Sequence, residues 1–320
     1  MNRDNLIYIA GHGGMVGSAL VRELERQGYA NLLLCSSKEL DLRDRGAVED
    51  FFAQHRPDYV FLAAARVGGI GANNAYPVEF LSDNLAIANN VINAAYFSGA
   101  KKLLNFGSSC IYPRAAAQPI SEETLLTGSL EQTNEAYALA KIAALKLCAY
   151  YHRQYGADFY SLMPTNLYGL GDNYDVQTAH VLPALIARFH EAERDGADTV
   201  TLWGDGSPLR ELLFADDLAQ AAIMLAQQCS AGDVGDWINV GSGQEVSIVQ
   251  LADLVRAVVY LDVEEDIQLQ LPRIIWDTTM PNGTPRKLLD SSRINALGWT
   301  ASTDLRDGIT IAYQDYLSRQ

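Results

Sequence analysis

Short apolar runs alternate with longer amphipathic segments through the first half of the chain. The apolar runs show no regular exchange of polar and apolar residues, which is typical of strands buried on both faces of a parallel sheet. They cover residues 6–10, 32–35, 59–63, 102–106 and 159–163. Helix-like segments separate them, at residues 15–27, 45–55, 81–98 and 134–155. This alternation predicts βαβ units, and therefore an α/β fold with a doubly wound, Rossmann-type parallel sheet.

The pattern becomes less regular after about residue 165, where two long helical stretches, 180–194 and 216–228, are separated by turn-rich segments. We expect a smaller α/β lobe here, placed against the carboxyl ends of the sheet strands, where open α/β sheets bind their ligands. The predicted division is a nucleotide-binding domain at 1–168 and a mainly substrate-binding lobe at 169–320. The chain is expected to cross back to the nucleotide lobe near 211–245.

A glycine-rich turn joins the first predicted strand to the first predicted helix. It has the spacing G-x-x-G-x-x-G over residues 11–17. Glycines allow a tight turn and a close approach of the backbone, and a helix N-terminus offers free N–H groups to a pyrophosphate. A purely structural turn is the alternative, but the flanking strand and helix favour a dinucleotide site. The candidate residues for that site are Gly11, Gly14, Met15, Val16 and Gly17.

Charge and cysteine content narrow the class of protein. The formal net charge of −15 disfavours nucleic-acid binding, although local Arg and Lys residues can still bind a small anion. No apolar stretch is long enough to span a membrane, and the first residues lack the pattern of a signal peptide. Four cysteines show neither metal-ligand spacing nor the density of a disulfide framework. We therefore expect a cytoplasmic protein without a metal site.

The residues after the second predicted strand bear on the choice of cofactor. NAD-specific folds place an acidic residue there for the ribose 2′-hydroxyl, whereas this chain reads Cys-Ser-Ser-Lys at 35–38. The Ser37 hydroxyl and the Lys38 ammonium suit a 2′-phosphate, so NADP is favoured. Glu39 and Asp41 would reverse this preference if the register differed by a residue or two. The alternative place for Asp41 and Leu42 is beside the adenine.

Tyr137 and Lys141 stand four residues apart on a predicted helix, so that both lie on one helix face. A nearby cation lowers the pKa of a phenol, and such a tyrosine can exchange a proton as a hydride moves. Ser108 lies between the glycine turn and this helix, at the end of a predicted strand. Glycine turn, Ser, Tyr and Lys together resemble the extended short-chain dehydrogenase/reductase family.

Within that family, four further motifs resemble the NADPH-dependent 3,5-epimerase/4-reductases that convert GDP-4-keto-6-deoxy-D-mannose to GDP-L-fucose. They read VGGI at 67–70, GSSCIYP at 107–113, MPTNLYG at 163–169 and GTPRKLLD at 283–290. The resemblance implies that Ser108 binds the 4-keto oxygen, Tyr137 donates a proton to it, and Lys141 orients the nicotinamide ribose. It also implies that Cys110 and His180 form the acid/base pair that inverts carbons 3 and 5.

The same resemblance implies the binding residues and the assembly. NADP(H) would contact Tyr137, Lys141, Pro164, Asn166, Leu167 and His180. A GDP-linked 4-keto deoxy sugar would contact Ser108, Arg188, Trp203, Arg210, Asn282 and Lys287. The family also suggests a homodimer that packs through the predicted helices at 81–98 and 134–155.

Other interpretations stay open from the sequence. The closest keeps the chemistry but changes the sugar, to a 3,6-dideoxy hexose or a 6-deoxy heptose. A 4,6-dehydratase is disfavoured, because those enzymes resemble Thr-Asp-Glu where this chain has Ser-Ser-Cys at 108–110. A catalytically silent NADP-binding regulator is disfavoured by the intact Ser108, Tyr137 and Lys141. Cys110 could also serve only for packing, His180 as a helix cap, and Trp203 as an anchor for its loop.

The chain departs from its relatives at three places. Gly13 stands where bacterial relatives commonly carry Arg, residues 169–173 read GLGDN in place of GPHDN, and Asn282 replaces the usual Asp. We expect the last two departures to lie in the sugar-nucleotide region, where they would affect the choice of sugar more than the reaction class.

The cofactor assignment makes a prediction about Lys38. Wild-type protein should bind NADPH more tightly than NADH, and Lys38→Ala should weaken NADPH binding about tenfold, because a lost charged hydrogen bond costs about 1.5 kcal/mol. Titration of both cofactors against both proteins measures this. Equal affinities in the wild type, or no selective loss of NADPH binding in the variant, would contradict the assignment.

Overall fold

The computed structural model describes residues 1–176, 178–260, 271–280 and 282–320. Its centre is a parallel six-stranded sheet in the order β2-β1-β3-β4-β5-β9. The predicted doubly wound α/β fold is therefore confirmed. In that order, the strands are Leu32–Leu33, Ile7–Ala10, Tyr59–Leu62, Lys102–Phe106, Phe159–Pro164 and Trp237–Val240.

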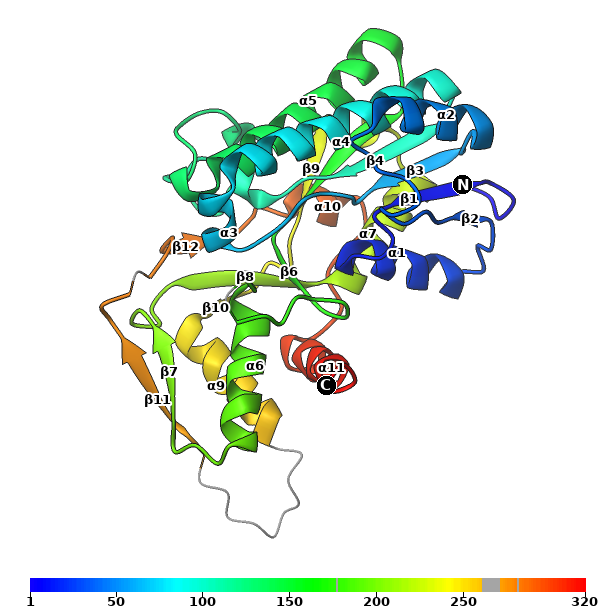
Figure 1. Ribbon diagram of the computed structural model, residues 1–320. Coiled ribbons are helices and arrows are strands. Elements are labelled where there is room, and N and C mark those ends of the chain that lie inside the picture. The colour runs from blue at the N-terminus through cyan, green and yellow to red at the C-terminus, as the bar shows by residue number, and fades with distance from the viewer. Residues whose placement is uncertain (177, 261–270, 281) are drawn as a thin grey trace.

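Helices cover both faces of this sheet (Figure 1). Tyr8 and Ala10 of β1 point into the core beneath α2, α4 and α5. Ile7 and Ile9 point into the opposite core, which α1 and α7 complete. Burial on both sides explains why the strand sequences are apolar throughout. The bounds are Met15–Arg26 for α1, Arg45–His55 for α2, Pro77–Ser98 for α4, Glu135–Tyr155 for α5 and Ala215–Gln228 for α7.

The predicted and observed bounds differ most at two elements. The helix expected at 81–98 begins earlier, at Pro77, because proline suits the first helical turn, where its missing N–H has no partner to lose. The strand expected at 32–35 is reduced to Leu32–Leu33 and pairs with β1 alone, at the edge of the sheet.

A second lobe lies beside the sheet (Figure 1). Its centre is β8 (Leu209–Phe214), which pairs with β6 (Asn166–Tyr168), β10 (Glu245–Ser247) and β12 (Arg286–Lys287). A two-stranded sheet of β7 (Thr199–Trp203) and β11 (Arg273–Asp277) flanks it. The helices that complete its core are α6 (Val181–Arg194), α9 (Ile248–Tyr260) and α11 (Leu305–Leu317).

The chain connects the two lobes more than once. After β8 it runs into α7, which packs against α1, and then into β9 at the edge of the large sheet. Short helices complete the path: α3 (Ile70–Ala75), α8 (Ala231–Val234) and α10 (Ser292–Ala296). The domain boundary at residue 168 stays a prediction. Among the described residues, no helix is both long and apolar enough to cross a membrane.

Candidate active site

The glycine turn after β1 brings backbone segments close together. Gly11 has a φ of +87°, and a Cβ atom there would lie 2.7 Å from the backbone of Ala64, just after β3. A Cβ atom on Gly17 would lie 2.0 Å from the Gly11 carbonyl oxygen. No side chain of the described residues caps helix α1 at Gly14, so the helix N-terminus remains available to an anion. The turn has the geometry that a pyrophosphate requires.

The loop after β2 holds both candidate carboxylates in local contacts. The Ser36 backbone N–H and hydroxyl donate to Glu39 Oε2 over 2.8 and 2.7 Å, and these bonds lower the pKa of Glu39. Arg43 binds both oxygens of Asp41 through the Nε–Nη2 edge of its guanidinium and lowers the pKa of that carboxyl to about 2. Lys38 is exposed and forms no ion pair with any described residue. Its ammonium group thus remains available to a ligand.

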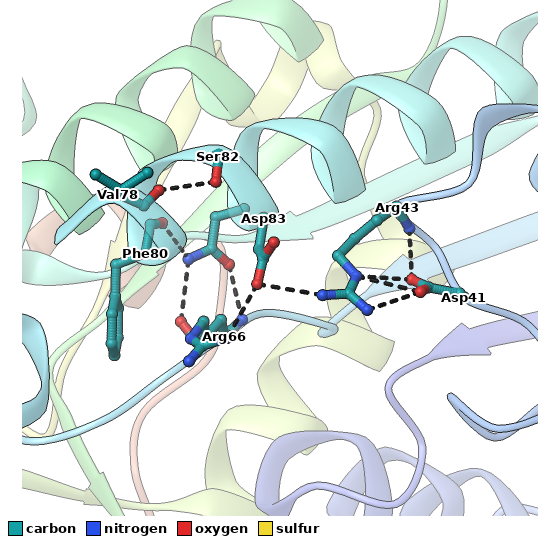
Figure 2. A network of polar contacts seen from close by, with 8 residues as sticks. Asp41, Arg43, Arg66, Val78, Phe80, Ser82 and Asp83 are labelled. Carbon is teal, nitrogen blue, oxygen red and sulfur yellow. Dashed lines mark hydrogen bonds and ion pairs between the residues drawn. The ribbon is translucent and has the colours of Figure 1, made fainter. Parts of the chain in front are cut away.

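Helix α4 ties the loops after β2 and β3 together (Figure 2). Asp83 accepts from Arg66 over 3.1 Å and from Arg43 over 3.5 Å. The buried amide of Asn84 accepts from the Arg66 N–H over 2.8 Å and donates to the Arg66 carbonyl over 3.0 Å. Sequence reasoning missed this network. The available signal was the set of polar residues on an otherwise apolar helix.

The same network reaches the predicted catalytic tyrosine. The Arg66 guanidinium lies 5.7 Å from the centre of the Phe80 ring. Phe80 in turn meets Tyr137 edge-to-face, with 6.3 Å between ring centroids. Helix α4 therefore packs against both the loop after β3 and the side chain of Tyr137.

Helix α5 places Tyr137 and Lys141 together, as their spacing predicts. Lys141 Nζ donates to the Phe106 carbonyl at the end of β4 over 2.7 Å and lies 5.7 Å from the centre of the Tyr137 ring. Burial lowers the pKa of Lys141 to about 8. Burial, and then the charge of Cys110, raise the pKa of Tyr137. The expected lowering of the phenol pKa by Lys141 is wrong in this structure, because burial of the phenol dominates and the charge of Cys110 acts in the same direction.

Cys110 and Ser108 follow β4 in a short 3₁₀ turn, Ser109–Ile111. The Ser108 hydroxyl accepts from the Cys110 N–H over 3.4 Å. Cys110 is only 8% exposed, and its burial raises the pKa of the thiol. The positive charges of Lys287 and Lys141 act in the opposite direction.

His180 is the residue that precedes helix α6, and it remains accessible to solvent. Partial burial and then the charge of Lys287 lower the pKa of its imidazole. Lys287 thus acts on both His180 and Cys110. The predicted catalytic residues Cys110, Tyr137, Lys141 and His180 thus form one group with Lys287, in which the charges influence one another. The roles assigned to these residues stay predictions.

Arg210 and Lys287 are neighbours across the β8–β12 pair. Neither forms an ion pair with a described residue, and burial lowers the pKa of both. Two partly buried cations side by side favour an anionic ligand such as a diphosphate. Asn166 and Pro164 lie at the nearby end of β5, where Asn166 donates to the Glu211 carbonyl over 2.9 Å. These positions agree with a diphosphate close to the end of the large sheet.

The other predicted substrate residues surround the end of β7. Trp203 is 59% exposed, and Arg188 donates to the carbonyl of Thr201, two residues earlier, over 3.0 Å. Asn282 Oδ1 accepts from the Asp205 N–H over 2.8 Å and so closes the turn after Trp203. The exposed ring of Trp203 suits a stacked base.

The loop at 169–173 contacts both the phosphate-turn helix and the C-terminal helix. Gly171 lies beside Met15 and Ser18 at the start of α1, and its N–H donates to Asp315 of α11 over 3.1 Å. The expected place of this loop in the sugar-nucleotide region stays a prediction. A cavity of about 710 Å³ lies outside the site, lined by the loop at 113–132.

Comparison with known proteins agrees with this geometry. The family model described as "NAD dependent epimerase/dehydratase family" matches residues 7–241. GDP-L-fucose synthase 1 of Arabidopsis thaliana is 54% identical and is aligned over 97% of this chain and 93% of its own length. GDP-L-fucose synthase of Escherichia coli (strain K12) is 47% identical over 98% and 97%, respectively.

Among solved structures, a GDP-6-OMe-4-keto-L-xylo-heptose reductase from C. jejuni matches with a TM-score of 0.91 and 34% identity, covering 100% of this chain and 99% of that one. The resemblance to extended short-chain dehydrogenase/reductases is confirmed. Because the family model spans well over half of the chain and these relatives cover nearly all of it, the chain belongs to the NAD dependent epimerase/dehydratase family.

Proposed function

We propose that this protein is an NADPH-dependent 3,5-epimerase/4-reductase that converts GDP-4-keto-6-deoxy-D-mannose to GDP-L-fucose. The observation that carries the proposal is the location of Cys110 and His180 in the same charged group as Tyr137 and Lys141. A simple reductase needs only a Ser, Tyr and Lys set, whereas an epimerase also needs groups that exchange protons beside the ketone. GDP-L-fucose synthases that are 47–54% identical support the same reading.

NADP(H) fits the residues present. The Gly11 and Gly17 positions leave no room for a side chain, and the start of α1 is open to a pyrophosphate. A GDP-mannoheptose C4 reductase from Campylobacter jejuni, 36% identical, has been solved with NADP bound. The reduced nicotinamide supplies the hydride that reduces carbon 4. Lys141 would hold its ribose, and Lys38 would bind its 2′-phosphate.

Epimerisation depends on the acidity of the protons that flank a ketone. Removing one of them places negative charge on the ketone oxygen, where Ser108 and Tyr137 would donate hydrogen bonds. Cys110 and His180 would remove and return the protons at carbons 3 and 5. The lowered pKa of His180 keeps its imidazole neutral near pH 7 and ready to accept a proton.

Reduction then needs one proton at the oxygen of carbon 4. The raised pKa of Tyr137 keeps its hydroxyl protonated before the reaction, so the group can act as the donor. Lys141, with a pKa near 8, remains cationic at neutral pH and stabilises the tyrosinate that forms.

A related sugar is the second candidate for the substrate. A GDP-L-colitose synthase from Yersinia pseudotuberculosis is 36% identical, and several C. jejuni heptose enzymes are 34–36% identical. The Arabidopsis thaliana and Escherichia coli GDP-L-fucose synthases are more similar to this chain, at 47–54% identity. NADPH oxidation over a panel of GDP- and UDP-linked 4-keto sugars tests the choice. GDP-4-keto-6-deoxy-D-mannose should be the best substrate, and faster turnover of another sugar would replace it.

We also propose a homodimer and a cytoplasmic location. Helices α4 and α5 pack side by side and present exposed apolar side chains, which a second copy of the chain would cover. The four cysteines are free thiols, as is usual in a reducing compartment. The exposed apolar residues on the two helices are Val78, Leu85, Phe97, Leu139, Tyr150 and Tyr155.

The epimerase step predicts a specific defect in Cys110→Ser. In deuterated water without NADPH, wild-type protein should exchange deuterium into carbons 3 and 5 of the 4-keto sugar. The variant should exchange about 10²–10⁴ times more slowly, because a hydroxyl replaces the titratable thiol. Mass spectrometry of the sugar measures this. Cys229→Ser, at the end of α7, serves as the control, and exchange at the wild-type rate in Cys110→Ser would remove Cys110 from the mechanism.

The dimer predicts an effect of Phe97→Glu on assembly. The Phe97 side chain is 79% exposed, so the change should leave the fold intact but place a charge in an apolar interface. Sedimentation velocity should show a dimer for the wild type and a monomer for the variant. Leu126→Glu, an exposed residue outside the two helices, should remain dimeric. A monomeric wild type, or a dimeric Phe97→Glu protein, would contradict the proposed interface.

A further inference from the structure

Glu211 occupies a buried junction of four chain segments. It is 0% exposed, in the middle of β8. Its carboxylate accepts from the Gly243 N–H over 2.8 Å and from the Leu289 N–H over 3.0 Å. Its backbone carbonyl accepts from the Asn166 side chain over 2.9 Å and from the Thr165 hydroxyl over 3.3 Å. One residue thus joins the end of β5, β8, the loop after β9 and the segment after β12.

This carboxylate has no cationic partner. Within the described parts of the chain, no Arg, Lys or His forms an ion pair with Glu211, and burial raises the pKa of its carboxyl. Burying a carboxylate without a cationic partner is costly, and an apolar side chain would fill the position at lower cost. The loop after β9 is also adapted to it, because a Cβ atom on Gly241 would lie 2.3 Å from Glu211 Oε1. A role beyond packing is therefore indicated.

The segment that Glu211 holds carries Lys287. On one side, Lys287 pairs with Arg210 of β8, and Leu289 is bonded to Glu211. On the other side, Leu288 is bonded to Gln118 and Ile120 over 2.8 Å each. The segment is thus fixed between β8 and the loop that follows Cys110.

Lys287 is the charge that Cys110 and His180 share. Leu289, two residues after Lys287, packs in the same buried apolar cluster as Cys110. The charges of Lys287 and Lys141 lower the pKa of Cys110 against the effect of its burial, and the charge of Lys287 adds to burial in lowering the pKa of His180. The charges of Cys110, Arg210 and Glu131 act in turn on Lys287. A positive charge there favours the thiolate over the thiol and the neutral imidazole over the imidazolium. Displacing the Lys287 ammonium would therefore raise the pKa values of both Cys110 and His180, the proposed acid/base pair.

We propose that Glu211 is a positioning residue that acts through Lys287, holding its strand so that the ammonium stays beside Cys110 and His180. The inference rests on the proposed epimerase function and adds two residues to it. Glu211 touches neither substrate nor cofactor in this proposal. In this proposal, Lys287 neutralises a diphosphate and also sets the protonation states of Cys110 and His180.

The test is the pH profile of deuterium exchange into carbons 3 and 5 of GDP-4-keto-6-deoxy-D-mannose without NADPH. Glu211→Gln keeps the shape but can accept only one of the two N–H bonds. The pH profile of Glu211→Gln should move to higher pH. The profile of Lys287→Met should move in the same direction, because loss of the Lys287 ammonium raises the pKa values of Cys110 and His180. A move of one pH unit lowers the rate tenfold on the ascending limb. The double variant should move no further than Lys287→Met, because the two changes act through one charge.

Asp217→Asn is the matched control. Asp217 is a second buried carboxylate, 1% exposed, which accepts from the Ser302 hydroxyl over 2.9 Å and from the Thr303 N–H over 3.0 Å and makes no bond to the segment that carries Lys287. Its profile should stay at the wild-type position. If Glu211→Gln does not fold, Gly241→Ala replaces it, since the added methyl group presses on the same carboxylate from the loop after β9. The same alkaline displacement is expected.

The outcomes separate the two proposals. A wild type that exchanges no deuterium refutes the proposed function. A wild type that exchanges normally, with an unmoved profile in folded Glu211→Gln or Gly241→Ala, overturns the positioning role. An unmoved Lys287→Met profile, additive effects in the double variant, or an equal displacement in Asp217→Asn overturns it as well.

Discussion

Burial of both faces of the parallel sheet is the constraint on which the rest of the molecule depends. With helices on either side, a polar side chain along a strand needs a partner inside the core, as Asn105 and Ser161 find in each other over 3.0 Å. Reactive groups therefore gather where the strands end. Ser108 and Cys110 follow β4, and Asn166 follows β5. The carboxyl edge of the sheet is the place where the fold permits chemistry.

The site collects positive charge in a protein whose net charge is negative. The protein carries a formal net charge of −15, yet the groups that meet at the sheet edge include Lys141, Lys287 and Arg210. Burial lowers the pKa of each of these cations, which means that holding them charged costs free energy in the absence of an anion. A bound diphosphate would recover that cost. The same desolvation that penalises the empty site strengthens its interactions with an anionic substrate.

Local patterns predicted much of this arrangement. Strand and helix positions followed from apolar runs, and the joint location of Tyr137 and Lys141 followed from helix geometry, because both depend on neighbours a few residues away. The direction of the Tyr137 pKa did not follow, since it depends on how many atoms of other elements surround the ring. The partners in the Arg66–Asp83–Arg43 network and in the bonds of Glu211 did not follow either. Polar residues on the apolar helix α4 indicate that some contact exists. The partners lie 17 to 78 residues apart in the chain, and one sequence does not identify a partner at such separations.

The contacts of Asn282 and of the loop at 169–173 indicate what the departures from the relatives change. Asn282 uses its side-chain oxygen to accept from Asp205, and an aspartate could accept the same bond, so the substitution removes a charge without opening the turn beside Trp203. The loop at 169–173 touches Met15 and Ser18 at the start of α1 and Asp315 of α11, so its altered sequence lies between the phosphate-turn helix and the C-terminal helix. Both differences therefore fall on turns, while Ser108, Tyr137 and Lys141 keep the residue types of the family motif.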